Sequence, residues 1–177
     1  MQHMPSIAID MDETIADPIT KARSWYYRDY GTIFTEDQLR GKSLSEAVPP
    51  EHKGIIHKYL NTPGFFRDLP VYPDAQRVIE ALNKKYKVYI VSAAMEFPNS
   101  LMDKISWLQD NFPFLTWRQY CLCGDKSLVQ TDYMIDDLIR NFQFFKGKPL
   151  LFTGPHNIHI EGYDRILNWE DAAAKLL

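Results

Sequence analysis

The stretch Ser6-Ile7-Ala8-Ile9-Asp10-Met11-Asp12-Glu13-Thr14-Ile15-Ala16-Asp17 decides how the fold of this chain is interpreted. Its first four residues are mostly apolar and too few for a helix, so they predict a buried strand. Asp10 and Asp12 follow directly, one residue apart. Residues i and i+2 of an extended chain lie on the same side, so both carboxylates are expected to face one small site. Two carboxylates placed in this way repel each other unless a cation lies between them.

The same spacing suits phosphoryl transfer. Asp10 is placed to attack phosphorus as a nucleophile, which would give an aspartyl-phosphate. Asp12 is placed to protonate the leaving oxygen and then to deprotonate the water that cleaves the intermediate. A hard divalent cation, expected to be Mg²⁺ with Asp10 and Asp12 among its ligands, would keep Asp10 ionised and screen the phosphate. Thr14 is expected to brace the loop through a local hydrogen bond.

Length and composition predict one soluble globular domain with room for a small inserted module. The chain has 177 residues, of which 45% are hydrophobic and 24% are charged. Its net charge of −3 gives no support for a nucleic-acid polymer as ligand, although a locally positive pocket would still accept a small anion. We expect no membrane span, and no secretory signal in Met1–Pro5. Cys121 and Cys123 are too close for an ordinary disulfide, which fits a reducing cytoplasm.

The chain between the first strand and the rest of the core is expected to form a helical cap. This cap covers residues 17–72 and is inserted into an α/β core made of residues 1–16 and 73–177. Its pattern contains no clear strand. The predicted cap helices are Ile19–Tyr30 after Pro18, a short helix begun by the Thr35/Gln38 capping box, Ser43–Val48 and Glu51–Leu60.

The remaining chain alternates strands and helices, which predicts a parallel sheet with helices on both faces. The predicted strands are Lys87–Val91, Tyr120–Cys123, Tyr133–Ile135 and Leu150–Phe152. The first predicted helix is capped by Asp74 and has Ala75, Val78, Ile79 and Leu82 on its buried face. The second begins at Asn99 or Ser100, with Leu101, Ile105 and Leu108 facing in. The last two are Leu138–Lys146 and Trp169–Leu176, which is capped by Asn168.

Polar residues stand at the carboxyl ends of these strands, where ligands bind to sheets of this kind. Ser92 follows one strand, Lys126 lies in the loop after another, and Asp136-Asp137 ends a third. Each alone has a simpler explanation as a loop hydroxyl, a solvated charge or a helix start. Together with the two aspartates of the first strand they supply a nucleophile, an acid/base group, phosphate contacts and a further metal carboxylate. The combined set favours phosphoryl transfer.

The Asp-x-Asp-x-Thr pattern after an apolar strand resembles the haloacid dehalogenase (HAD) phosphohydrolase signature, and the order of the later residues matches the four HAD motifs. Within this superfamily the chain resembles the 5′(3′)-deoxyribonucleotidase family. The stretches that carry this resemblance are Asp10–Asp17, Pro63–Leu69, Asp125–Val129, Ile135–Asp137 and Phe152–Asn157. They run in order over most of the chain, with the weakest coverage in the cap.

The resemblance implies an Mg²⁺-dependent phosphatase for nucleoside monophosphates, with an α/β core and a helical cap. It implies that Asp10 is the nucleophile, Asp12 the acid/base, and Ser92 and Lys126 the phosphate contacts. It also implies that Asp136 is a direct metal ligand, supported by Asp137. Glu13-Thr14 departs from the Gly-Val of family members in animals, and Ala93-Ala94 departs from the usual sequence after the second motif. Neither departure removes a catalytic group, but both bear on the identity of the group attached to the phosphate.

Phe65 and Phe66 are candidates for the walls of a nucleobase pocket, because flat rings stack on bases, and Trp25 is the next candidate. The alternative for these aromatic residues is packing within the cap. Zinc is not expected, because His156, His159 and Cys121-x-Cys123 match no ordinary zinc spacing. Two other functions stay open: an HAD phosphatase for another small phosphate ester, and a non-catalytic nucleotide-binding protein. The sequence leaves the base, the sugar and the oligomeric state undetermined.

Overall fold

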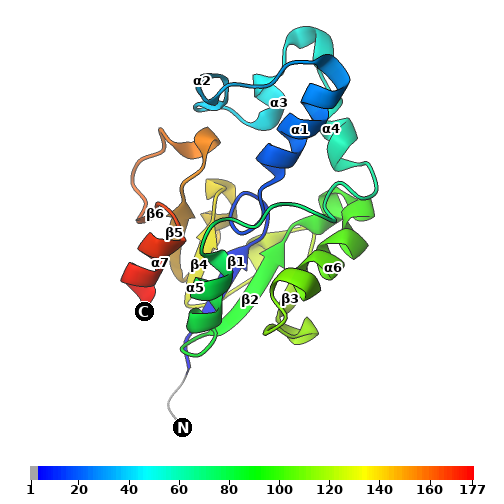
Figure 1. Cartoon of the computed structure of the whole chain (residues 1–177). Helices are drawn as coiled ribbons and strands as arrows, with labels where there is room; N and C mark the ends of the chain where they lie inside the picture. Colours follow the sequence, from blue (N-terminus) through cyan, green and yellow to red (C-terminus); the bar gives the residue numbers. More distant parts are fainter. Residues whose placement is uncertain (1–3) are drawn as a thin grey trace.

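Strand β1 (Ser6–Asp10) lies inside a six-stranded parallel sheet of order β3-β2-β1-β4-β5-β6 (Figure 1). The computed structural model describes residues 4–177. Every neighbouring pair of strands is parallel, so the carboxyl ends of β1, β2 and β4 meet at one edge. The other strands are β2 (Lys87–Ser92), β3 (Tyr120–Leu122), β4 (Tyr133–Asp136), β5 (Lys148–Phe152) and β6 (Arg165–Ile166). The predicted α/β parallel sheet is confirmed.

Three α-helices pack on one face of the sheet: α5 (Ala75–Leu82), α6 (Leu101–Asn111) and α7 (Trp169–Leu176). Their apolar residues join the inward side chains of β1, β2 and β5 in one buried cluster. Burial of apolar side chains at about 25 cal/mol per Å² is the main force that holds such layers together. Asn168 caps α7 as predicted, because its side chain accepts the N–H of Asp171.

Short 3₁₀ helices cover the opposite face. They include η5 (Lys126–Leu128) and η6 (Ile139–Phe142), and the smaller cluster beneath them contains Met134 and Phe142. The α-helix predicted over Leu138–Lys146 is therefore wrong. The N–H of Leu138 and the amide of Asn141 both bond to Asp136 at the strand end, and this local bonding competes with helix formation. The other 3₁₀ helices are η1 (Pro50–His52), η2 (Ala94–Glu96), η3 (Pro98–Ser100), η4 (Trp117–Gln119) and η7 (Pro155–Asn157).

Further local predictions differ from the structure. The single helix predicted over Glu51–Leu60 is divided at Gly54 into η1 and a helix over Ile55–Leu60. Strand β6 was not predicted, because it has only two residues and lacks an apolar run. Asp74 does not cap α5 with its side chain, which instead accepts hydrogen bonds from Arg77. The buried hydroxyl of Thr14 has no hydrogen-bond partner among the described residues, so it does not brace the loop. The loop is held instead through the Thr14 carbonyl, which accepts the indole N–H of Trp169 at 2.9 Å.

The segment 17–72, which we call the cap, carries α1 (Pro18–Tyr30), α2 (Glu36–Leu39), α3 (Leu44–Ala47) and α4 (Ile55–Leu60) and lies above the sheet edge in Figure 1. Asp17 caps α1 by accepting the N–H of Thr20, and Gly31 ends it in a left-handed conformation with φ 69°. The Thr35/Gln38 capping box starts α2 as predicted. The division of the chain into core and cap stays a prediction.

The two ends of the cap run side by side. The backbone N–H of Asp17 donates to the carbonyl of Pro70, and the backbone N–H of Tyr72 donates to the carbonyl of Ile15. Farther out, the N–H of Gly64 bonds to Asp103 on α6 at 2.7 Å. These contacts place the return segment of the cap, which contains Phe65 and Phe66, beside α6. Among residues 4–177, we find no helix with the length and apolar character needed to cross a membrane.

Candidate active site

Asp10 ends β1 at the edge where the strands finish, and it is 7% exposed. Its Oδ1 lies 2.6 Å from Nζ of Lys126, and the same ammonium group lies 2.7 Å from Oδ2 of Asp136. Lys126 is 4% exposed and begins η5, directly beneath these two strand ends. A buried ammonium between two buried carboxylates bonds to both of them but neutralises only one of the two negative charges.

Electrostatics at this centre are dominated by burial. Burial raises the pKa of Asp10 well above its usual range, against the opposing effect of Lys126, and the carboxylates of Asp136 and Asp137 add to the rise. The pKa of Asp136 is raised for the same main reason. Burial by itself lowers the pKa of Lys126, but the attraction of Asp10 and Asp136 is stronger and raises it. The excess of carboxylates over cations is the electrostatic condition for binding a further cation.

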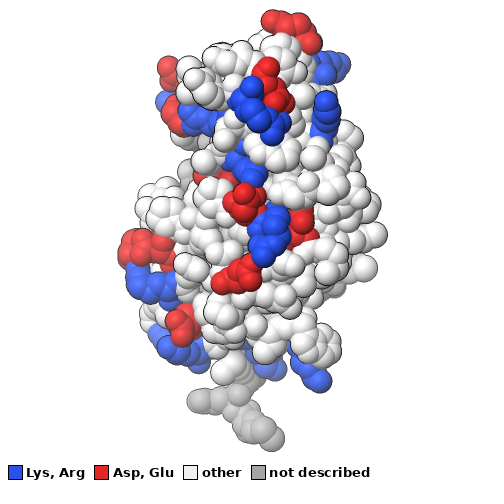
Figure 2. Space-filling model, turned by 45° about the vertical axis from the view of Figure 1, so that its right-hand side comes forward, with Lys and Arg blue, Asp and Glu red and all other residues white. Residues whose placement is uncertain are grey.

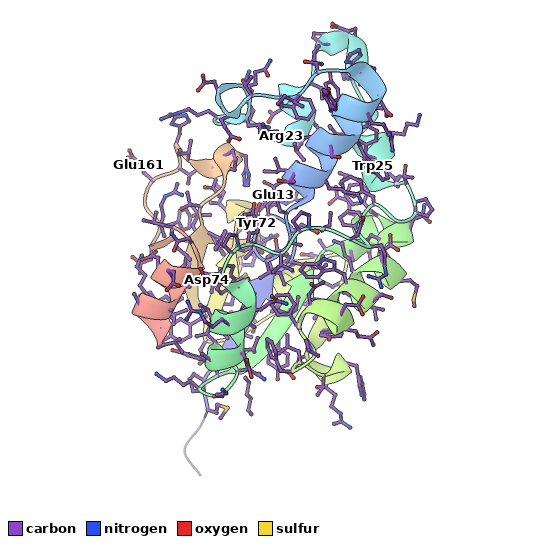
Figure 3. The ribbon with its side chains drawn as sticks, viewed as in Figure 1. Glu13, Arg23, Trp25, Tyr72, Asp74 and Glu161 are labelled. Atoms are coloured by element: carbon purple, nitrogen blue, oxygen red, sulfur yellow. The ribbon has the colours of Figure 1, made fainter. Side chains whose placement is uncertain are left out.

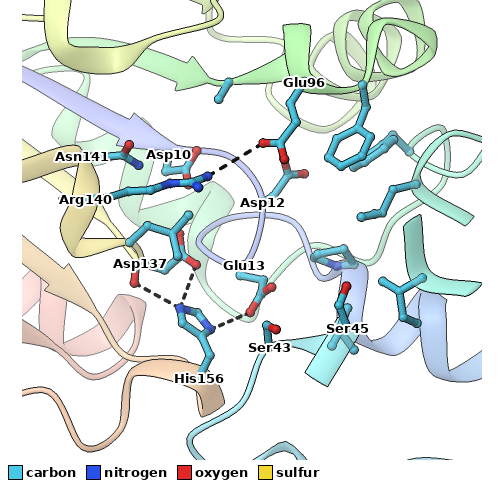
Figure 4. Close-up of a pocket in the computed structure, with 18 of the residues that line it drawn as sticks. Asp10, Asp12, Glu13, Ser43, Ser45, Glu96, Asp137, Arg140, Asn141 and His156 are labelled. Carbon is cyan, nitrogen blue, oxygen red and sulfur yellow. Dashed lines mark hydrogen bonds and ion pairs between the residues drawn. The ribbon is translucent and has the colours of Figure 1, made fainter. Parts of the chain in front are cut away.

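His156, on η7, joins Asp137 to Glu13 (Figure 4). Its Nε2 lies 3.1 Å from Oδ2 of Asp137, and its Nδ1 lies 3.0 Å from Oε2 of Glu13. Burial lowers the pKa of this imidazole, but the hydrogen bonds to the two carboxylates outweigh it and raise the pKa to about 10. Glu13 has a left-handed backbone with φ 55°, which is unfavourable for a residue with a Cβ and is found most often at functional sites. Figure 3 shows Glu13 between the sheet edge and α1.

The carboxylates of Asp10, Asp136 and Asp137 fit a divalent cation. They offer ligand oxygens that lie within 4.8 Å of one another. Both oxygens of Asp136 already accept hydrogen bonds, from Lys126, Leu138 and Asn141. In contrast, Oδ1 of Asp137 is buried and makes no hydrogen bond to the described residues. Such an orphaned buried oxygen is the donor that a metal ion would satisfy, so the geometry favours Asp137 at least as much as Asp136.

A second group within the described residues also meets the distance criterion for a metal, and it consists of Glu13, Asp137 and His156. Neither group contains a cysteine. His159 lies against Gly41 of the cap, and Cys121 belongs to β3.

Asp12 bonds to a lysine that the sequence analysis missed. Nζ of Lys104, on α6, donates to Oδ2 of Asp12 and, at 2.9 Å, to Oγ of Ser92. Lys104 is 1% exposed and its ammonium lies over the ring of Phe66. The sequence does contain a sign of this role, because Lys104 lies on the same helical stripe as Leu101 and Leu108, where an apolar residue is expected. A charged residue in that position needs a buried partner.

The cavity above these residues has a volume of about 490 Å³. Its floor is formed by Asp10, Asp12, Lys104 and Lys126, and its cap side is formed by Ser43, Leu44, Ser45, Ile56, His57, Leu60 and Phe66. Phe65 does not line this cavity. It is fully buried and packs edge-on against Trp25 at 5.1 Å and against Phe66 at 5.1 Å. Ser92 is also absent from the lining, since its hydroxyl is turned to Lys104.

Arg140 and Glu96 form an exposed ion pair at the rim, with 3.8 Å between their charged groups (Figure 4). Both residues line the cavity, and both also line a neighbouring cavity of about 570 Å³ that extends toward Ser127 and Phe144. An exposed pair of this kind contributes little to stability. Its guanidinium is therefore available to an anion that approaches the buried carboxylates and lysines.

Comparison with solved structures identifies the fold. The structure of a provisionally named HAD-hydrolase, YfnB from Bacillus subtilis bound to magnesium, matches with a TM-score of 0.60 at 15% identity and with 99% of each chain covered. An L-2-haloacid dehalogenase matches with a TM-score of 0.58 at 13% identity, over 98% of this chain and 99% of the other. At this identity the likeness shows the fold, which is HAD-like.

Sequence comparison then gives the family. The family model described as 5′ nucleotidase, deoxy (pyrimidine), cytosolic type C protein matches residues 4–177. A Staphylococcus aureus (strain Mu50) relative, provisionally named as a 5′(3′)-deoxyribonucleotidase, is 42% identical over 168 residues, which cover 94% of this chain and 92% of that protein. The 5′(3′)-deoxyribonucleotidase of Bacillus subtilis (strain 168) is 37% identical over 180 residues, covering 97% and 98%. The chain belongs to the 5′(3′)-deoxyribonucleotidase family, and its fold is HAD-like.

Membership makes this chain an enzyme of the phosphoric monoester hydrolase class. It confirms both resemblances that the sequence motifs indicated. The structure brings Asp10, Asp12, Lys126 and Asp137 to the wall of one cavity from three separate parts of the chain, with Asp136 buried beside them. The roles of these individual residues stay predictions.

Proposed function

We propose that this protein hydrolyses nucleoside monophosphates, deoxyribonucleotides among them, to nucleoside and inorganic phosphate through an aspartyl-phosphate on Asp10. The observation that carries the proposal is the arrangement of Asp10, Lys126 and Asp12 at the floor of one cavity. A nucleophile, an ammonium for phosphate oxygens and a second carboxylate at the same floor are the groups that the two-step reaction requires.

In the first step a carboxylate oxygen of Asp10 attacks phosphorus, and the bond from phosphorus to the nucleoside oxygen breaks. Lys126 is held by Asp10 and Asp136, and we assign to it the neutralisation of negative charge on the phosphoryl oxygens. The electron pair of the broken bond stays on the nucleoside oxygen, which takes the proton of the Asp12 carboxyl group. Asp12 is left as a carboxylate.

In the second step water attacks the phosphorus of the aspartyl-phosphate. The Asp12 carboxylate removes one proton from that water, and the bond from phosphorus to the Asp10 oxygen breaks. Inorganic phosphate forms, Asp10 becomes a carboxylate again and Asp12 regains its proton. Asp12 suits both steps because its side chain is 31% exposed, whereas that of Asp10 is 8% exposed.

Asp10, Asp136 and Asp137 are the residues proposed to hold a divalent cation, and we propose Mg²⁺ because the donors are all oxygens. When bound, the cation would keep the carboxylates ionised and neutralise phosphate charge. Support comes from the buried, unpartnered Oδ1 of Asp137 and from the magnesium bound to the HAD-hydrolase YfnB. The proposed ligand set replaces the side chain of Asp12 with that of Asp137, because it is Asp137 that offers an oxygen within 4.8 Å of those of Asp10 and Asp136.

The cap side of the cavity supports a nucleoside as the group attached to the phosphate. Leu44, Ile56, Leu60, Phe66 and Phe97 give it an apolar wall, and Ser45 and His57 add polar groups. Small-ligand sites commonly combine an apolar wall with a few polar groups in this way. On the face in Figure 2, acidic and basic side chains are intermixed over cap and core, which fits a small ligand better than a nucleic-acid strand. A cytoplasmic location, proposed from the free cysteines, stays a prediction.

Phosphate release from a panel of nucleoside monophosphates, sugar phosphates and an aryl phosphate tests the proposal, with Mg²⁺ or with EDTA. We expect the highest kcat/KM on a nucleoside monophosphate and loss of turnover in EDTA. Preference for a sugar phosphate would instead identify another HAD phosphatase. Binding of nucleotides without phosphate release from any member of the panel would identify a non-catalytic nucleotide-binding protein.

A further inference from the structure

We propose that Lys104 is a positioning residue of this site, whose ammonium group fixes the Asp12 carboxylate for proton transfer to and from the reacting oxygen. The inference rests on the proposed phosphatase function and assigns a role to a residue that the motif sequences do not include. The juxtaposition that carries it is a buried lysine on α6 bonded to Asp12 and to Ser92, which come from the carboxyl ends of two different strands.

The side chain of Lys104 is only 2% exposed, so its ammonium group is almost completely withdrawn from bulk water. A buried cation destabilises the fold strongly unless it is paired and hydrogen-bonded. Asp12 supplies the opposite charge, Ser92 accepts a further hydrogen bond, and the Phe66 ring centroid lies 4.5 Å from Nζ. Replacing such a pair by apolar residues is often neutral or stabilising, so packing alone does not account for a lysine on the core-facing stripe of α6.

The geometry defines what the lysine does. Its tetrahedral ammonium is held by Ser92 on the buried side, so the direction of its bond to Asp12 is fixed. Asp12 thereby has one restrained orientation at the cavity floor rather than several rotamers. A proton donor held in its reactive orientation removes part of the entropic barrier, and small misplacements of such groups reduce rates strongly.

The charge of Lys104 also lowers the barrier to proton transfer from Asp12. Asp12 changes from a neutral carboxyl group to a carboxylate when it gives its proton to the nucleoside oxygen. A fixed ammonium beside the developing carboxylate stabilises this transition state without reorganisation. This gain in rate is largest when the leaving oxygen is strongly basic and needs full protonation. It is small for an aryl phosphate, whose phenolate leaves without a proton.

The experiment compares Lys104→Met and Lys104→Gln with wild type on a nucleoside monophosphate and on an aryl phosphate with a good leaving group. The Met variant keeps the length of the side chain without charge, and the Gln variant keeps a hydrogen-bond donor. We expect Lys104→Met to lower kcat on the nucleotide by about 10–100-fold, which is less than complete loss of a general acid–base group, and on the aryl phosphate by much less. The Gln variant should lie between wild type and the Met variant. Lys84→Met, at an exposed lysine just beyond the end of α5, is the matched control and should change neither rate.

The same substitution in an Asp12→Asn background separates positioning from a direct contact with phosphate. If Lys104 acts through Asp12, Lys104→Met costs little more once Asp12→Asn is present. An undiminished loss in that background, or equal losses on both substrates in the single variant, overturns the inference. A wild-type protein that releases no phosphate from either substrate would contradict the proposed function instead, so the two failures are distinct.

Discussion

The ammonium group of Lys104 lies 4.5 Å from the centroid of the Phe66 ring, so an aromatic residue at the end of the cap touches the polar centre of the core. A cation over a phenyl face is worth about 0.5–2 kcal/mol, depending on how far it is desolvated. Phe66 also lines the cavity, where a base could stack on it for about 1–3 kcal/mol. Phe66 is therefore placed both to position Lys104 and to bind the nucleoside.

We predict that Phe66→Leu lowers kcat/KM on a nucleoside monophosphate by at least about tenfold, and on an aryl phosphate with a good leaving group by much less. Lost stacking on the base and lost support for Lys104 both act on the nucleotide, because the aryl phosphate needs neither a base contact nor assisted proton transfer. Steady-state kinetics on the two substrates measures the difference. Equal losses on both substrates would leave Phe66 with no contact to the base.

Phe65→Leu is the matched control for that experiment. Phe65 is fully buried between Trp25 and Phe66 and does not line the cavity. We expect this variant to lower the free energy of unfolding by about 1–3 kcal/mol, as aromatic core truncations do, with little change in substrate preference. Thermal unfolding and the same kinetic assay check both statements. A selective loss on nucleotides would return Phe65 to the list of base-binding candidates.

We predict that Asp10→Asn abolishes turnover while the fold is retained. An amide is a poor nucleophile toward phosphorus and does not supply an anionic ligand to Mg²⁺. In wild type, beryllium or aluminium fluoride, which mimic a phosphoryl group, should bind only when Mg²⁺ is present. The measurements are phosphate release and fluoride-salt inhibition, with circular dichroism as the control for folding. Full activity in the variant would remove Asp10 as the nucleophile.

We predict that Asp12→Asn loses far more activity on a nucleotide than on an aryl phosphate. The nucleoside oxygen needs a proton to leave, whereas a phenolate with a low pKa does not. Rates across a series of aryl phosphates should depend more steeply on the pKa of the leaving phenol in the variant than in wild type. The same slope in both proteins would mean that Asp12 is not the general acid.

Sequence reasoning succeeded where the chemistry depends on neighbouring residues. Asp10 ends β1 and Asp12 lies two residues farther along the chain, so their spacing alone brings them to one site. Parallel topology then adds Asp136 and Lys126, because strand ends share one edge of the sheet. These predictions needed only local pattern and a rule about sheets.

Contacts that depend on packing were not predicted. Lys104 is 92 residues from Asp12, and His156 is 143 residues from Glu13. The sequence showed a lysine on a core-facing stripe and a histidine in a family motif, but it gave no indication of the partner of either. The segment after β4 illustrates the same limit, since its helical pattern was overruled by the hydrogen bonds of Leu138 and Asn141 to Asp136.

The last prediction concerns His156, whose hydrogen bonds to Asp137 and Glu13 raise the pKa of its imidazole to about 10 in spite of burial. A histidine with a higher pKa in the folded than in the unfolded chain binds its proton more tightly when folded. Its contribution to stability is therefore complete below the unfolded pKa of about 6.5 and is lost as the pH rises through about 10. We predict that His156→Gln destabilises the protein most near pH 6 and progressively less toward pH 10.

Urea unfolding of wild type and His156→Gln at several pH values between 6 and 10 measures this difference. EDTA is present throughout, so that no divalent cation competes with the imidazole for Asp137. His159→Gln, an exposed histidine three residues along the same segment, is the matched control and should give a difference that is small at every pH. A destabilisation by His156→Gln that stays constant from pH 6 to pH 10 would show that the imidazole carries no proton-linked interaction with Asp137 and Glu13. In that case its role in the folded protein would be limited to packing and neutral hydrogen bonding.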